Sequence, residues 1–133
     1  MVRQDNMTRE DKDLLLKDLC AKLPYGVKAK YYGAAEECEC CDIIEGIYPM
    51  DNEIVIGQYA LSVDNIKPYL FPLSSMTKKQ KKEYAHILVM SSNLACSQLI
   101  GETTQDWFNK YHFDYRGLIP MGLALDATGL NIY

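Results

Sequence analysis

The chain has 133 residues, of which 48% are hydrophobic and 24% charged, and its formal net charge is −4. This is the length and composition of one ordinary globular domain, with too many periodic apolar residues for a disordered chain. No apolar run is close to the length of about 18 residues that a membrane-spanning helix needs. The polar start MVRQDN predicts no signal peptide.

The first predicted element is an amphipathic helix from Arg9 to about Leu23. Thr8 is a typical N-cap residue, and Asp11 follows at the capping-box position. Apolar residues then recur at helical spacing: Leu15, Leu16, Leu19, Cys20 and Leu23. Charged side chains are expected on the opposite, solvent side: Arg9, Glu10, Lys12, Asp13, Lys17 and Lys22. The following PYG segment (24–26) ends the helix, because proline disfavours helix before it and glycine permits a left-handed cap.

Short β-branched and aromatic runs separated by turn residues predict an antiparallel sheet in the next part of the chain. The expected strands are 27–32, 40–48, 53–59 and a short 69–71. Asp51 and Asn52 form the turn between the second and third strands, and 63–66 forms one helical turn. Pro68 and Pro72 exclude any longer helix in that region.

Two further helices are predicted in the second half. Thr77 caps the first, with Gln80 at the capping-box position, and the inner face carries Tyr84, Ile87 and Leu88. The helix ends at 91–93, although apolar residues up to Ile100 could extend it. Thr103 or Thr104 starts the second helix, which runs through Trp107, Phe108 and Tyr111.

These elements predict a single α+β domain over residues 1–133. Its N-terminal helix accompanies a three- to four-stranded, mainly antiparallel sheet, with two to three C-terminal helices packed on one face. The two ends, 1–7 and 128–133, are expected to be mobile.

Charge is distributed unevenly along the chain. Residues 31–66 contain no Lys or Arg but eight acids: Glu36, Glu37, Glu39, Asp42, Glu45, Asp51, Glu53 and Asp64. Such a surface repels phosphates, so nucleic acid is not an expected partner. The one basic cluster, which lacks Arg and interleaved aromatics, indicates a solvated helix face rather than a nucleic-acid footprint: Lys78, Lys79, Lys81 and Lys82.

Five cysteines without a signal peptide indicate reduced thiols in the cytoplasm. The Cys38–Cys41 run suggests zinc, but structural zinc sites usually add a second pair of ligands downstream. The available candidates are unpaired: Cys96, His86 and His112. We therefore expect buried or partly buried thiols, no metal and no cofactor.

Standard nucleotide-binding and hydrolase motifs are absent, which disfavours an enzyme. The densest polar and aromatic segment holds the candidate ligand- or partner-binding residues: Asp106, Trp107, His112, Asp114, Tyr115 and Arg116. An imidazole oriented by a carboxylate could transfer protons, but aromatics at helical spacing are more often core anchors and Asp114 is more often a cap. The hypothesis of a binding pocket in this segment requires that these side chains converge on a cavity. A His112 that is buried and hydrogen-bonded to backbone would contradict this hypothesis.

Two stretches, KPYLFPLSSMT (67–77) and DWFNKYHFDYRGLI (106–119), resemble a family of small uncharacterised proteins from gut anaerobic bacteria, their prophages and conjugative elements. The resemblance covers most of the chain, although Phe71 stands where relatives often have Arg. It implies a small accessory protein of a mobile element or phage, with a host-modulating or anti-defence role conceivable.

The leading hypothesis is therefore a cytoplasmic protein that acts by binding another protein. The alternative is a small-molecule-binding protein or minor enzyme using the 106–116 segment. No membrane partner is expected, and a homo-oligomer stays open.

Overall fold

The computed structural model describes residues 7–31, 40–92 and 104–133. Helix α1 (Arg9–Lys22) begins as expected, with the Thr8 hydroxyl accepting a hydrogen bond from the amide of Asp11 at 3.1 Å. A 3-10 turn follows at Leu23–Tyr25 and ends at Gly26, whose φ of 72° is left-handed. The first predicted helix is confirmed.

The sheet has six strands rather than three or four, in the order β4-β3-β2-β1-β5-β6. Their bounds are β1 (Lys28–Tyr31), β2 (Cys40–Tyr48), β3 (Glu53–Ile56), β4 (Tyr59–Ser62), β5 (Ile66–Leu70) and β6 (Leu125–Asp126). The first five pair antiparallel, whereas β6 pairs parallel with β5. The sheet is therefore mixed.

The single strand expected at 53–59 is wrong, because a tight turn divides this segment into β3 and β4. Gly57 permits the turn through its φ of 60°. A Cβ on Gly57 would lie 2.7 Å from the hydroxyl oxygen of Tyr31, and the left-handed φ strains any larger residue at this position. The β-branched residues alone could not reveal this turn.

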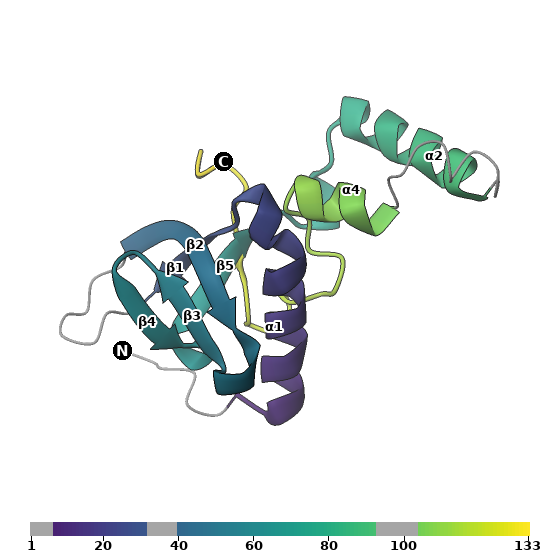
Figure 1. Cartoon of the computed structure of the whole chain (residues 1–133). Helices are drawn as coiled ribbons and strands as arrows, with labels where there is room; N and C mark the ends of the chain where they lie inside the picture. The colour runs from purple at the N-terminus through teal and green to yellow at the C-terminus, as the bar shows by residue number, and fades with distance from the viewer. Residues whose placement is uncertain (1–6, 32–39, 93–103) are drawn as a thin grey trace.

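The first five strands form a rolled meander in which β1 pairs with both β2 and β5 (Figure 1). A 3-10 turn at Val63–Asn65 joins β4 to β5, and an irregularity at Glu45 bends β2. This strand order carries no function by itself.

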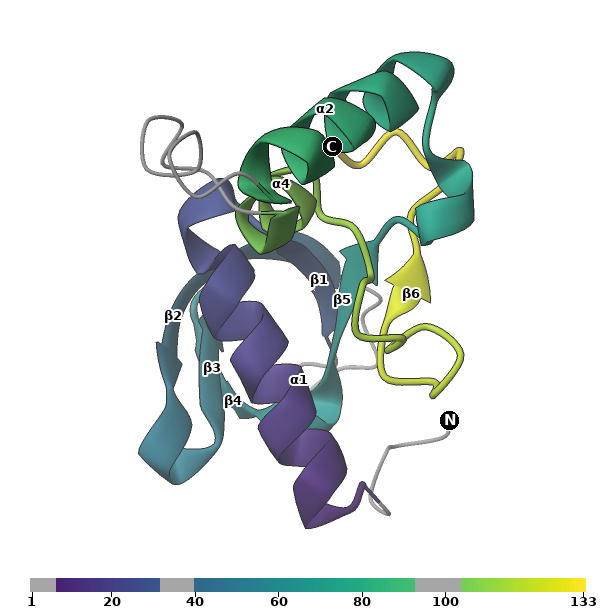
Figure 2. The same ribbon diagram turned by 90° about the vertical axis from the view of Figure 1, so that its right-hand side faces the viewer.

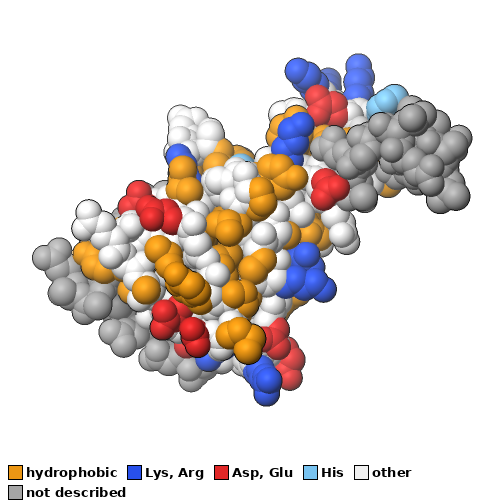
Figure 3. All heavy atoms as spheres, in the orientation of Figure 1, with side chains coloured by type: hydrophobic (Ala, Val, Ile, Leu, Met, Phe, Trp, Pro, Cys, Tyr) orange, Lys and Arg blue, Asp and Glu red, His pale blue; other side chains and the backbone are white. Residues whose placement is uncertain are grey.

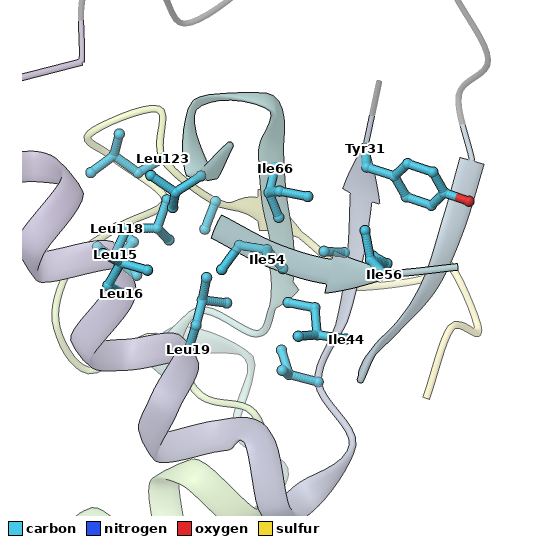
Figure 4. Packing of buried hydrophobic residues seen from close by; sticks show 14 of the residues in the cluster. Leu15, Leu16, Leu19, Tyr31, Ile44, Ile54, Ile56, Ile66, Leu118 and Leu123 are labelled. Carbon is cyan, nitrogen blue, oxygen red and sulfur yellow. The ribbon is translucent and has the colours of Figure 1, made fainter. Parts of the chain in front are cut away.

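Helix α1 covers the inner face of the rolled sheet. Leu15, Leu16 and Leu19 point from the helix toward side chains of the strands, as Figure 4 shows. The remaining buried members of this aliphatic core come mainly from the strands and include Ile44, Ile54, Ile56 and Ile66. At about 25 cal/mol per Å² of apolar surface removed from water, such burial is the main force holding α1 to the sheet.

Helices α2 (Lys78–Ser92) and α4 (Thr104–Lys110) pack on each other beyond the end of the sheet, not on its face (Figure 1). The expectation that C-terminal helices cover the sheet is therefore wrong, since α1 takes that position. Thr77 and Gln80 do form the predicted capping box of α2, with bonds of 2.9 and 3.1 Å. Leu88, expected on the inner face, is 44% exposed.

The chain returns from α4 to the sheet along β5, as seen from the side in Figure 2. Phe71 and Phe113 form a parallel bridge, with the amide of Phe71 donating to the carbonyl of His112. This bridge joins the two stretches that carry the family resemblance. None of the described helices is long and apolar enough to cross a membrane.

Candidate functional site

A buried ionic cluster lies where α1 meets α4 and the loop after it. Lys22 and Asp18 are one turn apart on α1 and have no exposed surface. The Lys22 ammonium donates to Asp18 Oδ1 at 2.5 Å and to the side-chain oxygen of Asn109 at 3.2 Å. Arg116 Nε donates to the same Asp18 oxygen at 3.2 Å. Asp18 and Lys22 together therefore link α1 to α4 and to the loop that carries Arg116.

The ring of Tyr115 lies close to both cations of this cluster. Lys22 Nζ and Arg116 Cζ are each 4.8 Å from the ring centroid, within range of a cation–π interaction. The Tyr115 hydroxyl accepts a hydrogen bond from Arg116 Nη2 at 2.8 Å. Its ring also stacks on Phe108 of α4, with 5.4 Å between centroids. The cluster is thus continuous with the aromatic core.

Burial has opposite effects on the two partners of the central ion pair. It raises the pKa of Asp18 and lowers the pKa of Lys22, and their mutual attraction opposes both shifts. Asp18 Oδ2 is buried with no hydrogen-bond partner among the described residues. Because the Lys22 amine is fully covered, no substrate can reach it, and the cluster acts as a structural junction.

His112 is buried against backbone instead of lining a cavity. Its exposed fraction is 9%, and its Nε2 donates to the carbonyl of Tyr25 at 2.9 Å. The imidazole ring also stacks on the ring of Tyr133, with the two ring centroids 3.9 Å apart. Burial lowers the pKa of His112, which favours the neutral imidazole. This is the arrangement that removes the pocket hypothesis.

The Asp114 carboxylate caps the following turn. Its two oxygens accept hydrogen bonds from the amides of Leu118 and Ile119, each at 2.8 Å. Asp114 is therefore a cap, which is the structural role that the sequence analysis favoured. Its carboxylate pairs with backbone amides instead of with Arg116. The ion pair of Arg116 is made with Asp18, far away in sequence.

Trp107 and Asp106 lie on α4, away from the ionic cluster. Trp107 is 2% exposed and stacks on Phe113, and its indole N–H lies 3.4 Å from a carboxylate oxygen of Glu83. Asp106 is partly exposed in the first turn of α4. Tyr115 and Arg116 share the ionic cluster, whereas the other four candidate residues lie in different surroundings and do not converge with them on a cavity.

The sequence interpretation missed Asp18, Lys22 and Asn109. Lys22 was expected on the solvent side of its helix, and this is wrong. The spacing held a signal, because Asp18 follows Leu15 by three residues and Lys22 follows Leu19 by three, which places both on the apolar face. Cys20, expected on that face, is exposed instead.

The remaining predicted sites lie at the surface or outside the described residues. All four lysines of the basic cluster are exposed on the first two turns of α2. Cys38 and Glu39 lie outside the described residues, as do the side chains of Cys40 and Cys41. Within ranges 7–31, 40–92 and 104–133, no group of three or more potential ligands could hold a metal ion.

No family model, curated protein or solved structure matches the chain. The resemblance to proteins of gut anaerobes and their mobile elements therefore stays a prediction.

Proposed function

We propose that this chain acts by binding another protein through the outer face of the β2–β3–β4 hairpins. The observation that carries the proposal is a set of apolar side chains that the fold leaves uncovered on this face. The sequence-based expectations of a cytoplasmic location and a mobile-element or phage origin remain part of the proposal.

The hairpin face consists of Ile43, Tyr48, Val55 and Ala60, with Met50 at the adjoining turn. Strand register places them together, since inward residues of the same strands, such as Ile44 and Ile54, are buried. Ile43 is 48% exposed, Tyr48 56% and Met50 95%. Tyr and Met are enriched at protein interfaces because they offer large or adaptable apolar contact area.

Acidic side chains border the hairpin face. Glu45, Asp51 and Glu53 belong to the same strands and turn, and residues 31–66 contain no Lys or Arg. In Figure 3, hydrophobic side chains form a band over the strands with acidic side chains beside it. The complementary partner is a protein whose surface combines apolar groups with Lys or Arg, which would speed its association.

Affinity capture from a host lysate tests this proposal with two matched variants. Tyr48→Asp places a charge on the hairpin face, and Met121→Asp places one at a similarly exposed position on a distant loop. We expect the wild-type chain and Met121→Asp to retain the same protein, and Tyr48→Asp to lose it. Binding should also weaken as salt rises, because the acidic border is exposed.

Retention of the same protein by Tyr48→Asp would contradict the hairpin face as the contact. Recovery of no protein above background by the wild-type chain would contradict the proposal as a whole.

A further inference from the structure

Tyr133 fills a gap between β1 and β5. The ladder between these strands ends at the pair Ala29 and Pro68, so the next position in register would bring Lys28 opposite Tyr69. The Tyr133 hydroxyl takes this place, accepting from the amide of Lys28 at 2.8 Å and donating to the carbonyl of Tyr69 at 2.8 Å. A side chain thereby replaces a backbone partner in the ladder.

The walls around the Tyr133 ring are aromatic and held in position. His112 stacks on one side, with centroids 3.9 Å apart and an interplanar angle of 12°. The bond from His112 to the carbonyl of Tyr25 fixes that imidazole. Phe71 contributes a second ring, 5.8 Å from Tyr133, and is itself fixed by its bridge to Phe113. The site is preorganised for a flat ring.

Tyr133 and the residues just before it are held less firmly than the rings of His112 and Phe71. Tyr133 is 40% exposed, and residues 128–131 are also exposed. Gly129 and Asn131 both adopt a left-handed φ, and the Lys28 ammonium bonds the carbonyl of Ile132 at 2.7 Å. With little buried apolar surface, this segment is expected to open at a lower free energy than the core beneath it.

The hydrogen-bonding pattern selects one chemical class. The amide of Lys28 needs an acceptor and the carbonyl of Tyr69 needs a donor, and a hydroxyl supplies both. A phenyl ring would make neither hydrogen bond, a carboxylate could not donate, and an ammonium could not accept. The ring walls then require that the hydroxyl be carried by an aromatic ring.

We propose that the space between Lys28, Tyr69, Phe71 and His112 is a phenol-binding site that accepts a tyrosine side chain from a partner polypeptide, and that Tyr133 occupies it within the free chain. The site is separate from the hairpin face.

The first test empties the site in the full-length chain and refills it with a small probe. Tyr133→Ala should bind p-cresol saturably, read from the backbone amide shift of Lys28 in NMR spectra, whereas toluene should bind roughly tenfold more weakly or not at all. Wild-type chain should require far more p-cresol, since its own ring competes. Tyr59→Ala removes another exposed tyrosine, on β4, and should behave as wild type.

The second test uses a peptide with the sequence ATGLNIY, corresponding to residues 127–133. Folded Tyr133→Ala should bind it more tightly than p-cresol, and a peptide ending in Phe should bind roughly tenfold more weakly. Absence of a saturable Lys28 shift with both probes, or equal binding of toluene and p-cresol, overturns the proposal.

Two further outcomes are decisive. If Tyr133→Ala does not fold, Tyr133→Phe replaces it: faster hydrogen exchange at the Lys28 amide supports the hydroxyl contact, and unchanged exchange overturns it. A wild-type dimer that Tyr133→Ala abolishes would make a second copy the occupant and overturn the assignment to a separate partner.

Discussion

The molecule has two regions with different hydrophobic cores. One region is the rolled sheet with α1, and the other is the pair of helices α2 and α4. The sheet core is mainly aliphatic and extensive, built mostly from Leu and Ile of α1 and of β2 to β5. The core around α4 is aromatic and small, centred on Trp107, Phe108 and Phe113. Few large rings replace many aliphatic side chains, so each ring in the second region carries a larger share of its stability.

The two regions also differ in the electrostatics of their helices. The first turn of α1 carries Glu10 and Asp11, which complement the positive end of the helix dipole. The first turn of α2 carries no acid but begins with lysines. Between the regions lies the buried cluster of Asp18, Lys22 and Arg116, which couples them. The stability of α2 and α4 therefore depends on a few aromatic and ionic contacts.

The largest expected effect comes from Trp107→Ala. Removing a buried indole from a small aromatic core should cost about 3–5 kcal/mol of unfolding free energy. Hydrogen exchange should then accelerate across α2 and α4 while the amides of β2 and β3 keep their protection. Equal loss of protection in both regions would contradict the separation of the two cores.

Asp18→Asn should have a comparable effect on the junction. The change leaves the buried Lys22 ammonium and the Arg116 guanidinium without their carboxylate, and breaking such a pair costs about 3–5 kcal/mol. Chemical denaturation measures the loss. Asp13→Asn, at an exposed position on α1, is the control and should change stability little.

A pH dependence is expected from His112. Its pKa is lowered from 6.5 by burial, with Lys22 and Lys28 nearby adding to the shift. Below 6.5 the unfolded chain therefore binds more protons than the folded one, and stability should fall as pH drops through the window between 6.5 and the folded-state pKa. Denaturation midpoints at several pH values measure this slope.

His112→Asn should flatten that slope, because asparagine does not titrate and tolerates the left-handed φ of 61° at this position. His86→Asn, at an exposed position on α2, should leave the slope in place. A slope that survives His112→Asn would assign the pH dependence to another group.

The smallest expected effect is a gain in stability. Lys78→Glu places an acid in the first turn of α2, just as α1 has two acids in its own first turn. The change should stabilise α2 by about 0.3–1 kcal/mol. Lys78→Gln, which removes the charge without reversing it, should give a smaller gain. A loss of stability in low salt would contradict the dipole argument.

Much of the local structure could be predicted because it rests on short-range chemistry. The Thr8 and Thr77 caps, the glycine stop after α1 and the bounds of β2 follow from residues within a few positions of each other. The tight turn at Gly57 escaped prediction because the β-branched residues before it and Tyr59 after it resemble one continuous strand. The two-residue β6 escaped it because so short a run has no periodicity to detect.

The candidate site shows where sequence reasoning ended. The 106–116 segment was correctly seen as dense in aromatic and polar groups, but Lys22 was misplaced on the solvent side. A lysine is almost never fully buried unless it is paired. The hydrogen-bond partners of Lys22 lie one turn away and 87 residues away, and the Tyr115 ring lies 4.8 Å from its ammonium. No local pattern can reveal a partner so distant.

The sequence by itself determined the helix starts, the approximate strands of the meander, the α+β class and the acidic character of residues 31–66. Tertiary structure alone decided which helix covers the sheet, how Arg116 reaches Asp18, and how Tyr133 comes to bridge β1 and β5. Caps and periodicity depend on neighbours within a turn, whereas burial and long-range pairing depend on how the whole chain closes around its cores.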